Sequence, residues 1–226
     1  MLEIACMVDI GIRPKNDDRA AINSHLVSNG IHTETIDISC LVVVCDGVGG
    51  YPYGDEAAAI VTEIFASIAD NQLNTEIINE YIIKANEAVI TAQKTDANHS
   101  KMTTTIAGLY INGDDFIAFN IGDSRIYRYR SYISQISVDH SQNNQLIYYI
   151  GGNQAFPEIV EGTGRVFEND IYILCTDGVW GVLEEIDFEK ILSAYEKSED
   201  ACKALITLAI EKGSKDNLSI IIVRRT

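Results

Sequence analysis

The sequence has 226 residues, 46% of them hydrophobic, and no linker-like stretch divides it, so we expect a single domain over residues 1–226. It carries 33 acidic and 17 basic side chains, a formal net charge of −16, and no basic cluster interleaved with aromatic residues. This composition argues against nucleic acid as a partner, and its excess of carboxylates suits solubility or the binding of hard cations.

The N-terminal residues and the cysteines indicate a cytoplasmic protein. The first twelve residues contain no Lys or Arg and include Glu3 and Asp9, unlike a secretory signal. The longest apolar runs have the length of strands, so we expect no membrane contact. None of the five cysteines forms a C-x-x-C pair, and Cys6, Cys45 and Cys175 lie in apolar runs, as reduced core residues do.

Two kinds of hydrophobic periodicity follow one another along the chain. Apolar stripes with helical spacing predict helices at residues 57–68 and 78–89, and a further pair near 188–195 and 201–210. Segment 137–168 is the least regular and is predicted to be an exposed lid or loop. Alternating or apolar runs predict strands at residues 2–10, 41–45, 104–111, 116–121, 125–132, 171–175 and 218–223. Because this order lacks regular strand–helix alternation, it favours an α+β fold of stacked antiparallel sheets covered by helices.

Four aspartates lie at the ends of predicted strands: Asp46, Asp123, Asp177 and Asp216. Three of them adjoin a glycine, which can turn the chain sharply. A single Asp-Gly pair is a common turn, but four such carboxylates could converge at one end of the sheets. They would then repel one another unless protonated or bound to divalent cations such as Mg²⁺ or Mn²⁺.

Eight motifs carry a resemblance that covers nearly the whole chain: GIRPKNDD (11–18), DGVGG (46–50), GDEAA (54–58), TTTIAGLYI (103–111), GDSRIYRYR (122–130), DHSQ (139–142), CTDGVW (175–180) and DNLSIIIV (216–223). In this order they resemble the PPM-type, or type 2C, metal-dependent protein serine/threonine phosphatases. The resemblance implies a four-layer α-β-β-α sandwich of two antiparallel sheets. It also implies a signalling enzyme of bacterial type, a monomer whose phosphoprotein substrates come from a serine/threonine kinase.

The resemblance further implies a site for two Mg²⁺ or Mn²⁺ ions, with water bridging the ions as the attacking group. By position, Asp46 would bridge both ions, the Gly47 carbonyl would complete one, and Asp177 and Asp216 would hold the other. Asp123 matches a position that helps to hold a weaker third ion.

Two further positions complete the catalytic set implied by the resemblance, in addition to Asp46. Asp18 matches an acid that acts on the metal through bound water. Arg13 matches the arginine that binds the substrate phosphate, a role suited to the planar and permanently charged guanidinium group. We expect His140 to have a structural or supporting role and Trp180 to pack against the sheets.

The sequence departs from the family at three places. Val48 replaces the histidine of many eukaryotic members, a change shared by many bacterial ones. Asn16 and Asp17 stand where Glu or Gln more often precedes the last acid of the first motif. Segment 139–177 is shorter than the flap of bacterial relatives, and this argues against substrate selection by a flap.

Two other functions remain open from the sequence. A pseudophosphatase would bind phosphoproteins without turnover, but its mark would be the loss of metal ligands, and all the expected carboxylates are present. A hydrolase of small phosphorylated metabolites would use the same site. Hydrolysis of a phosphopeptide, compared with a metabolite panel, separates these alternatives.

Overall fold

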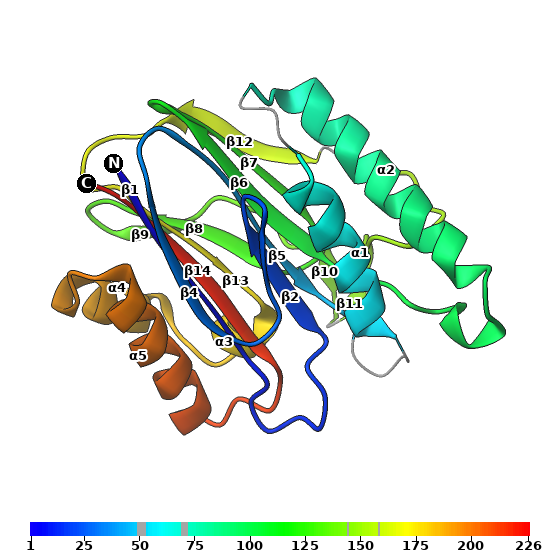
Figure 1. Ribbon diagram of the computed structural model, residues 1–226. Coiled ribbons are helices and arrows are strands. Elements are labelled where there is room, and N and C mark those ends of the chain that lie inside the picture. The colour runs from blue at the N-terminus through cyan, green and yellow to red at the C-terminus, as the bar shows by residue number, and fades with distance from the viewer. Residues whose placement is uncertain (49–52, 69–71, 144, 158) are drawn as a thin grey trace.

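The computed structural model describes residues 1–48, 53–68, 72–143, 145–157 and 159–226. Two antiparallel sheets lie against each other, and helices cover both outer faces (Figure 1). The predicted α-β-β-α sandwich is therefore confirmed. Two glycines of the DGVGG motif, Gly49 and Gly50, lie outside the described residues.

One sheet has the strand order β4-β1-β14-β13-β8-β9. Its outer face is covered by two helices, α4 and α5, and the short helix α3 follows β13 (Figure 1). The bounds are β4 Gly30–Ile36, β1 Leu2–Asp9, β14 Leu218–Arg225, β13 Ile171–Cys175, β8 Arg125–Tyr129, β9 Ile133–Gln135, α3 Asp177–Trp180, α4 Glu185–Ala194 and α5 Ser198–Glu211.

The other sheet has the order β12-β7-β6-β5-β2-β3, and α1 and α2 cover its outer face (Figure 1). A small hairpin of β10 and β11 lies outside both sheets. The bounds are β12 Val160–Arg165, β7 Asp115–Ile121, β6 Ile106–Asn112, β5 Ser39–Asp46, β2 Asp18–Ile22, β3 His25–Val27, β10 Ser141–Gln142, β11 Gln145–Leu146, α1 Gly54–Ala66, α2 Thr75–Gln93 and the 3-10 helix Ala97–His99.

Strand β5 shows why the chain forms four layers. Val42 and Val44 point into the apolar core between the two sheets, whereas Val43 and Cys45 point into a second core beneath α1 and α2. Because successive side chains of a strand face opposite sides, a strand that is apolar at every position needs cover on both faces. A third core lies between the first sheet and helices α4 and α5.

Helix α2 is closely predicted by its sequence. The stripe Ile78, Ile82, Ala85 and Val89 is fully buried against the second sheet. The helix begins after Asn74, whose side chain accepts a hydrogen bond from the backbone N–H of Ile77 at 2.9 Å. Such a cap satisfies an N–H group that has no partner within the helix.

The structure corrects the prediction for segment 137–168. The predicted lid contains strand β12, which pairs antiparallel with β7 and adds an edge strand to the second sheet. The predicted strand 125–132 is shorter than expected, because the chain turns after Tyr129 and returns as β9. Six further strands were not predicted: β2, β3, β4, β9, β10 and β11.

The cysteines and the helices are the next features that the sequence raised. All five cysteines are free and buried, as expected for reduced core residues. Within the part of the chain that the structure describes, no helix has both the length and the apolar character needed to cross a bilayer.

Candidate active site

Two of the predicted aspartates are neighbours across a strand pair. Asp46 ends β5, Asp18 begins β2, and the two residues lie directly opposite each other in the ladder. Thr104 Oγ1 donates to the carbonyl of Asp46 at 2.8 Å, and the N–H of Asp46 donates to Thr105 Oγ1 at 3.0 Å. The backbone of Asp46 is thus fixed by two threonines, while its side chain lines a pocket.

Gly47 lies where two backbone segments meet. A Cβ atom at this position would lie 2.3 Å from the carbonyl carbon of Gly54, the first residue of α1. No side chain fits there, so only glycine allows α1 to approach the end of β5 this closely. Packing therefore explains this glycine, and its carbonyl remains a predicted metal ligand.

Asp18 lies beneath the pocket and is only 1% exposed. Its Oδ2 atom accepts hydrogen bonds from Ser219 Oγ at 2.7 Å and from Thr176 Oγ1 at 2.9 Å. Burial raises its pKa to about 7, the two hydroxyl groups oppose the rise, and the charges of Asp177 and Asp216 add to it.

Three carboxyl groups that line the pocket, those of Asp46, Asp123 and Asp177, also have raised pKa values. Burial, followed by the charges of Asp18 and Asp177, raises the pKa of Asp46 well above its usual range. Burial and the charge of Asp177 raise the pKa of Asp123 to about 6. Burial and the charge of Asp216 likewise raise the pKa of Asp177. Without a cation, burial and mutual repulsion therefore both disfavour the ionised forms of these three groups.

Asp177 provides a separate sign that a cation fits here. Its Oδ1 atom is buried and has no hydrogen-bond partner in the structure. A buried acceptor without a partner is costly, and a divalent cation is a natural partner for a carboxylate oxygen. The donor set of the pocket therefore fits the metal ions that the sequence implies.

The aspartates line one pocket of about 1030 Å³. No three His, Cys, Asp or Glu side chains among the described residues are arranged to hold an ion by themselves. An ion here would need additional ligands, and hard cations readily take backbone carbonyls and water. Asp18 and Gly47 adjoin this pocket without lining it, whereas the other predicted site residues line it: Arg13, Asp46, Asp123, Asp177 and Asp216.

Arg13 lies in the loop between β1 and β2, and its Nη2 atom donates to Asp216 Oδ2 at 2.7 Å. The predicted phosphate-binding side chain thus contacts a predicted metal ligand. Both side chains are more than one-third exposed, so solvent weakens the ion pair. Arg13 can therefore leave Asp216 to contact another anion, and Asp216 can leave Arg13 to contact a cation.

Asn217 holds this loop in place, a role that the sequence does not reveal. Its Nδ2 atom donates to the carbonyl groups of Ile10 at 2.8 Å and Lys15 at 3.0 Å. Its Oδ1 atom accepts from the N–H of Asp17 at 2.9 Å. One amide therefore spans the loop that carries Arg13, and its position beside Asp216 was the only available signal.

His140 and Trp180 make contacts of a supporting kind. His140 is buried, its Nδ1 atom accepts from the N–H of Gly122 at 3.3 Å, and its Nε2 atom lies 3.4 Å from Glu161. The ring of Trp180 lies 3.5 Å from the guanidinium carbon of Arg125. His140 therefore supports the turn that precedes Asp123, and Trp180 packs as expected.

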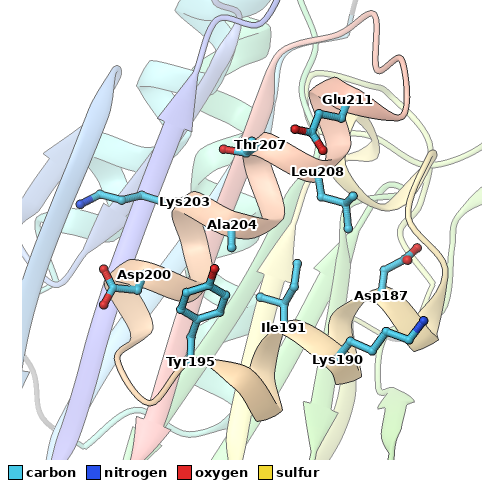
Figure 2. A pocket seen from close by; sticks show the side chains of 10 residues that line it. All are labelled: Asp187, Lys190, Ile191, Tyr195, Asp200, Lys203, Ala204, Thr207, Leu208 and Glu211. Carbon is cyan, nitrogen blue, oxygen red and sulfur yellow. The ribbon is translucent and has the colours of Figure 1, made fainter.

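A second hollow of about 700 Å³ lies between α4 and α5. These helices cover the outer face of the first sheet, the face that points away from the second sheet (Figures 1 and 2). Ile191, Tyr195 and Leu208 line it together with charged groups of both signs, including Lys190 and Asp200 (Figure 2). None of the predicted site residues lines this hollow. The carboxylate pocket is therefore the candidate active site, although the second hollow is the more apolar of the two.

Comparisons with known proteins identify the family of the chain. The family model described as protein phosphatase 2C matches residues 28–211. The serine/threonine phosphatase stp of Listeria monocytogenes is 26% identical over 235 residues, covering 92% of this chain and 93% of that protein. The serine/threonine protein phosphatase PstP of Mycobacterium tuberculosis is also 26% identical, covering 80% of this chain and 40% of that protein.

Solved structures show the same fold. The serine/threonine phosphatase Stp1 from Staphylococcus aureus has a TM-score of 0.86 at 24% identity, covering 100% of this chain and 96% of that one. The S. agalactiae serine/threonine phosphatase has a TM-score of 0.84 at 24% identity, with both chains fully covered.

The chain belongs to the protein phosphatase 2C family. This confirms the family predicted from the eight motifs, and with it a metal-dependent protein serine/threonine phosphatase that acts on phosphoproteins. The matched range excludes Arg13, Asp18 and Asp216, and the roles of all the predicted site residues stay predictions.

Proposed function

We propose that this protein hydrolyses phosphoserine and phosphothreonine in proteins, as part of bacterial signalling, with two divalent cations held by the carboxylate pocket. The observation that carries the proposal is the group of aspartates that line one pocket, several with raised pKa values and one with a buried, unpartnered oxygen. When bound, the cations supply the positive charge that activates water and stabilises the charge of the transferring phosphoryl group.

The ligand assignment is part of the proposal. Asp46 and the Gly47 carbonyl, with Asp177 and Asp216, would hold two ions, and Asp123 would help to hold a weaker third one. Their support is the shared pocket and the mutual repulsion of the side chains. Oxygen ligands of this kind suit Mg²⁺ and Mn²⁺ equally.

Asp18 and Arg13 have different tasks in this proposal. Two hydroxyl groups fix the orientation of the Asp18 carboxyl, which would act on a bound cation through water. Arg13 lies at the exposed edge of the pocket, where its guanidinium can leave Asp216 and bind phosphate bidentately.

The test is hydrolysis of a phosphothreonine peptide with and without added Mn²⁺ or Mg²⁺. The proposal expects turnover that depends on the cation and that exceeds turnover of phosphorylated metabolites. Binding of the peptide without hydrolysis would favour a pseudophosphatase. Preference for a metabolite would favour a small-molecule phosphatase.

The remaining parts of the proposal concern context. We propose one catalytic domain over residues 1–226, because one core joins the two sheets and each sheet forms a further core with its own helices. A monomer that acts in the cytoplasm on substrates of a serine/threonine kinase, without nucleic-acid or membrane partners, remains our prediction. The acidic charge supports the part about nucleic acid.

Replacing Arg13 by Ala is expected to raise the KM for a phosphopeptide about 10- to 100-fold, because charge-assisted hydrogen bonds to the phosphate are lost. Affinity for Mn²⁺ should not fall, since Arg13 competes with the cation for Asp216. Calorimetric titration beside kinetics measures both. Arg13→Lys keeps the positive charge but cannot form the bidentate contact, so its KM should lie between those of the wild-type protein and Arg13→Ala. A large loss of metal affinity in Arg13→Ala would contradict this role.

Val48 lines the pocket at the position where other family members carry histidine. Val48→His is expected to change turnover of an alkyl phosphoester more than that of an aryl phosphoester, because only the alkoxide leaving group strongly needs a proton. Val48→Asn, which is polar without being a comparable acid, serves as the control. Equal changes for both esters would refute the explanation.

A further inference from the structure

Two side-chain amides on α2 bind the turn that forms one wall of the pocket. Asn86 Oδ1 accepts from the N–H of Gly151 at 2.7 Å, and Asn86 Nδ2 donates to the carbonyl of Gly152 at 3.2 Å. Gln93 Nε2 donates to the carbonyl of Gly151 at 2.8 Å and to that of Met102 at 2.9 Å. We call Asn86 and Gln93 the amide clamp.

The turn itself fits closely under α2. Gly151 has φ +96°, and a Cβ atom there would lie 2.7 Å from Val89 Cγ1 and 2.9 Å from the carbonyl oxygen of Met102. Both the dihedral angle and the space therefore require glycine. The two amides, seven residues apart, lie on the same face of the helix as Val89 and reach this turn together.

The turn is also coupled to the carboxylates by short links. Ile150 and Thr104 exchange backbone hydrogen bonds of 2.8 and 3.1 Å. Thr104 Oγ1 in turn binds the carbonyl of Asp46 at 2.8 Å. The clamp, the turn and the end of β5 thus form one hydrogen-bonded chain that joins α2 to the candidate metal site.

Four residues of the turn line the carboxylate pocket and form what we call the rim: Tyr149, Gly151, Gly152 and Asn153. Of the clamp, Gln93 also lines this pocket and Asn86 does not. A phosphorylated side chain that reaches the aspartates brings its flanking polypeptide against the pocket walls. The segment is short, and hydrogen bonds fix it to a packed helix. It therefore forms a rigid surface for the polypeptide.

We propose that Asn86 and Gln93 are positioning residues, which hold the rim as a preformed binding surface for the polypeptide that flanks the phosphorylated residue. This inference rests on the proposed function. A preformed surface lowers the entropy that is lost on binding, so loss of the clamp should act on the binding of protein substrates first.

The experiment compares Asn86→Ala and Gln93→Met with the wild-type protein, using a phosphothreonine peptide and p-nitrophenyl phosphate. Asn86→Ala loses two hydrogen bonds to the turn, and Gln93→Met loses one to the turn and one to Met102. We therefore expect the KM for the peptide to rise about tenfold in each variant. The KM for the aryl phosphate, which has no flanking chain, should rise by a clearly smaller factor. Equal effects on both substrates, or none on the peptide, would overturn the proposal.

Two further variants separate the clamp from general damage to α2. Asn86→Asp keeps the acceptor for Gly151 and loses the donor to Gly152, so its KM for the peptide should lie between those of Asn86→Ala and the wild-type protein. Glu87 is the exposed neighbour on the same helix, and Glu87→Ala should leave both substrates unaffected.

Hydrogen exchange of residues 145–154 in the metal-free protein measures the clamp without catalysis. We expect the Gly151 amide, which donates to Asn86, to exchange at least about tenfold faster in Asn86→Ala. Unchanged exchange would overturn the clamp. Absence of phosphopeptide hydrolysis by the wild-type protein would instead contradict the proposed function, and the exchange result would still decide the clamp.

Discussion

Replacing Asp46 by Asn is expected to abolish metal binding and phosphopeptide hydrolysis together. The substitution keeps the size of the side chain and removes the negative charge that the proposal places between two cations. We expect kcat/KM to fall on the order of 10³-fold or more, since metal ions contribute several kcal/mol to stabilisation of the transition state. Calorimetric titration with Mn²⁺ and steady-state kinetics measure the two losses.

The fold should survive this change. Asp46 is held through its backbone by Thr104 and Thr105, and these contacts do not involve the carboxylate. Because the folded protein opposes ionisation of the Asp46 carboxyl, replacing it by a neutral amide should even raise the thermal midpoint of the metal-free protein at neutral pH. Asp200→Asn, an aspartate of the second hollow, is the matched control and should leave both measurements unchanged (Figure 2). Wild-type metal binding by Asp46→Asn would contradict the two-metal site.

The central strands could be predicted because burial on both faces leaves a continuous apolar run. Strand β13 has the predicted bounds, and β5 differs from its prediction by only a few residues. The edge strands β3, β4, β9 and β12 were missed because they lack this pattern, and the inner strand β2 is short and begins with two charged residues, Asp18 and Arg19. Most residues of β4 are exposed or half-buried, and β12 contains two glycines in a strand with a register shift. Such strands are defined by pairing with a partner that is distant in the sequence.

The candidate site also contains residues that the sequence predicts and residues that it does not. Aspartates beside glycines at strand ends could be recognised from the sequence, since their residue types imply a cation wherever the strand ends meet. The amides that position the loops could not. Asn86 binds a turn 65 residues further along the chain, and Asn217 binds the carbonyl of Ile10, 207 residues away. Their neighbours in the sequence carry no sign of these partners.

The stability of the metal-free protein is expected to fall as the pH rises from about 4 to about 7. Burial raises the pKa of Asp18 from 3.8 to about 7 and that of Asp123 to about 6, so the folded protein binds more protons than the unfolded chain across this range. Stability then decreases with pH, and the contribution of the protonated form is lost as the pH passes the folded pKa. For Asp18 the loss is on the order of 4 kcal/mol.

Urea denaturation in the presence of a chelator, from pH 4.5 to pH 7.5, measures this dependence. The net charge of −16 also destabilises the folded state as the pH rises, so the site must be separated from the surface. Asp18→Asn does this, because it removes one buried titration and changes the total charge by only one unit. We expect a clearly shallower decline in this variant. Saturating Mn²⁺ should flatten the wild-type curve, since a bound cation favours the ionised carboxylates. An unchanged slope in Asp18→Asn would contradict the raised pKa of Asp18, which is one part of the electrostatic argument for a cation in this pocket.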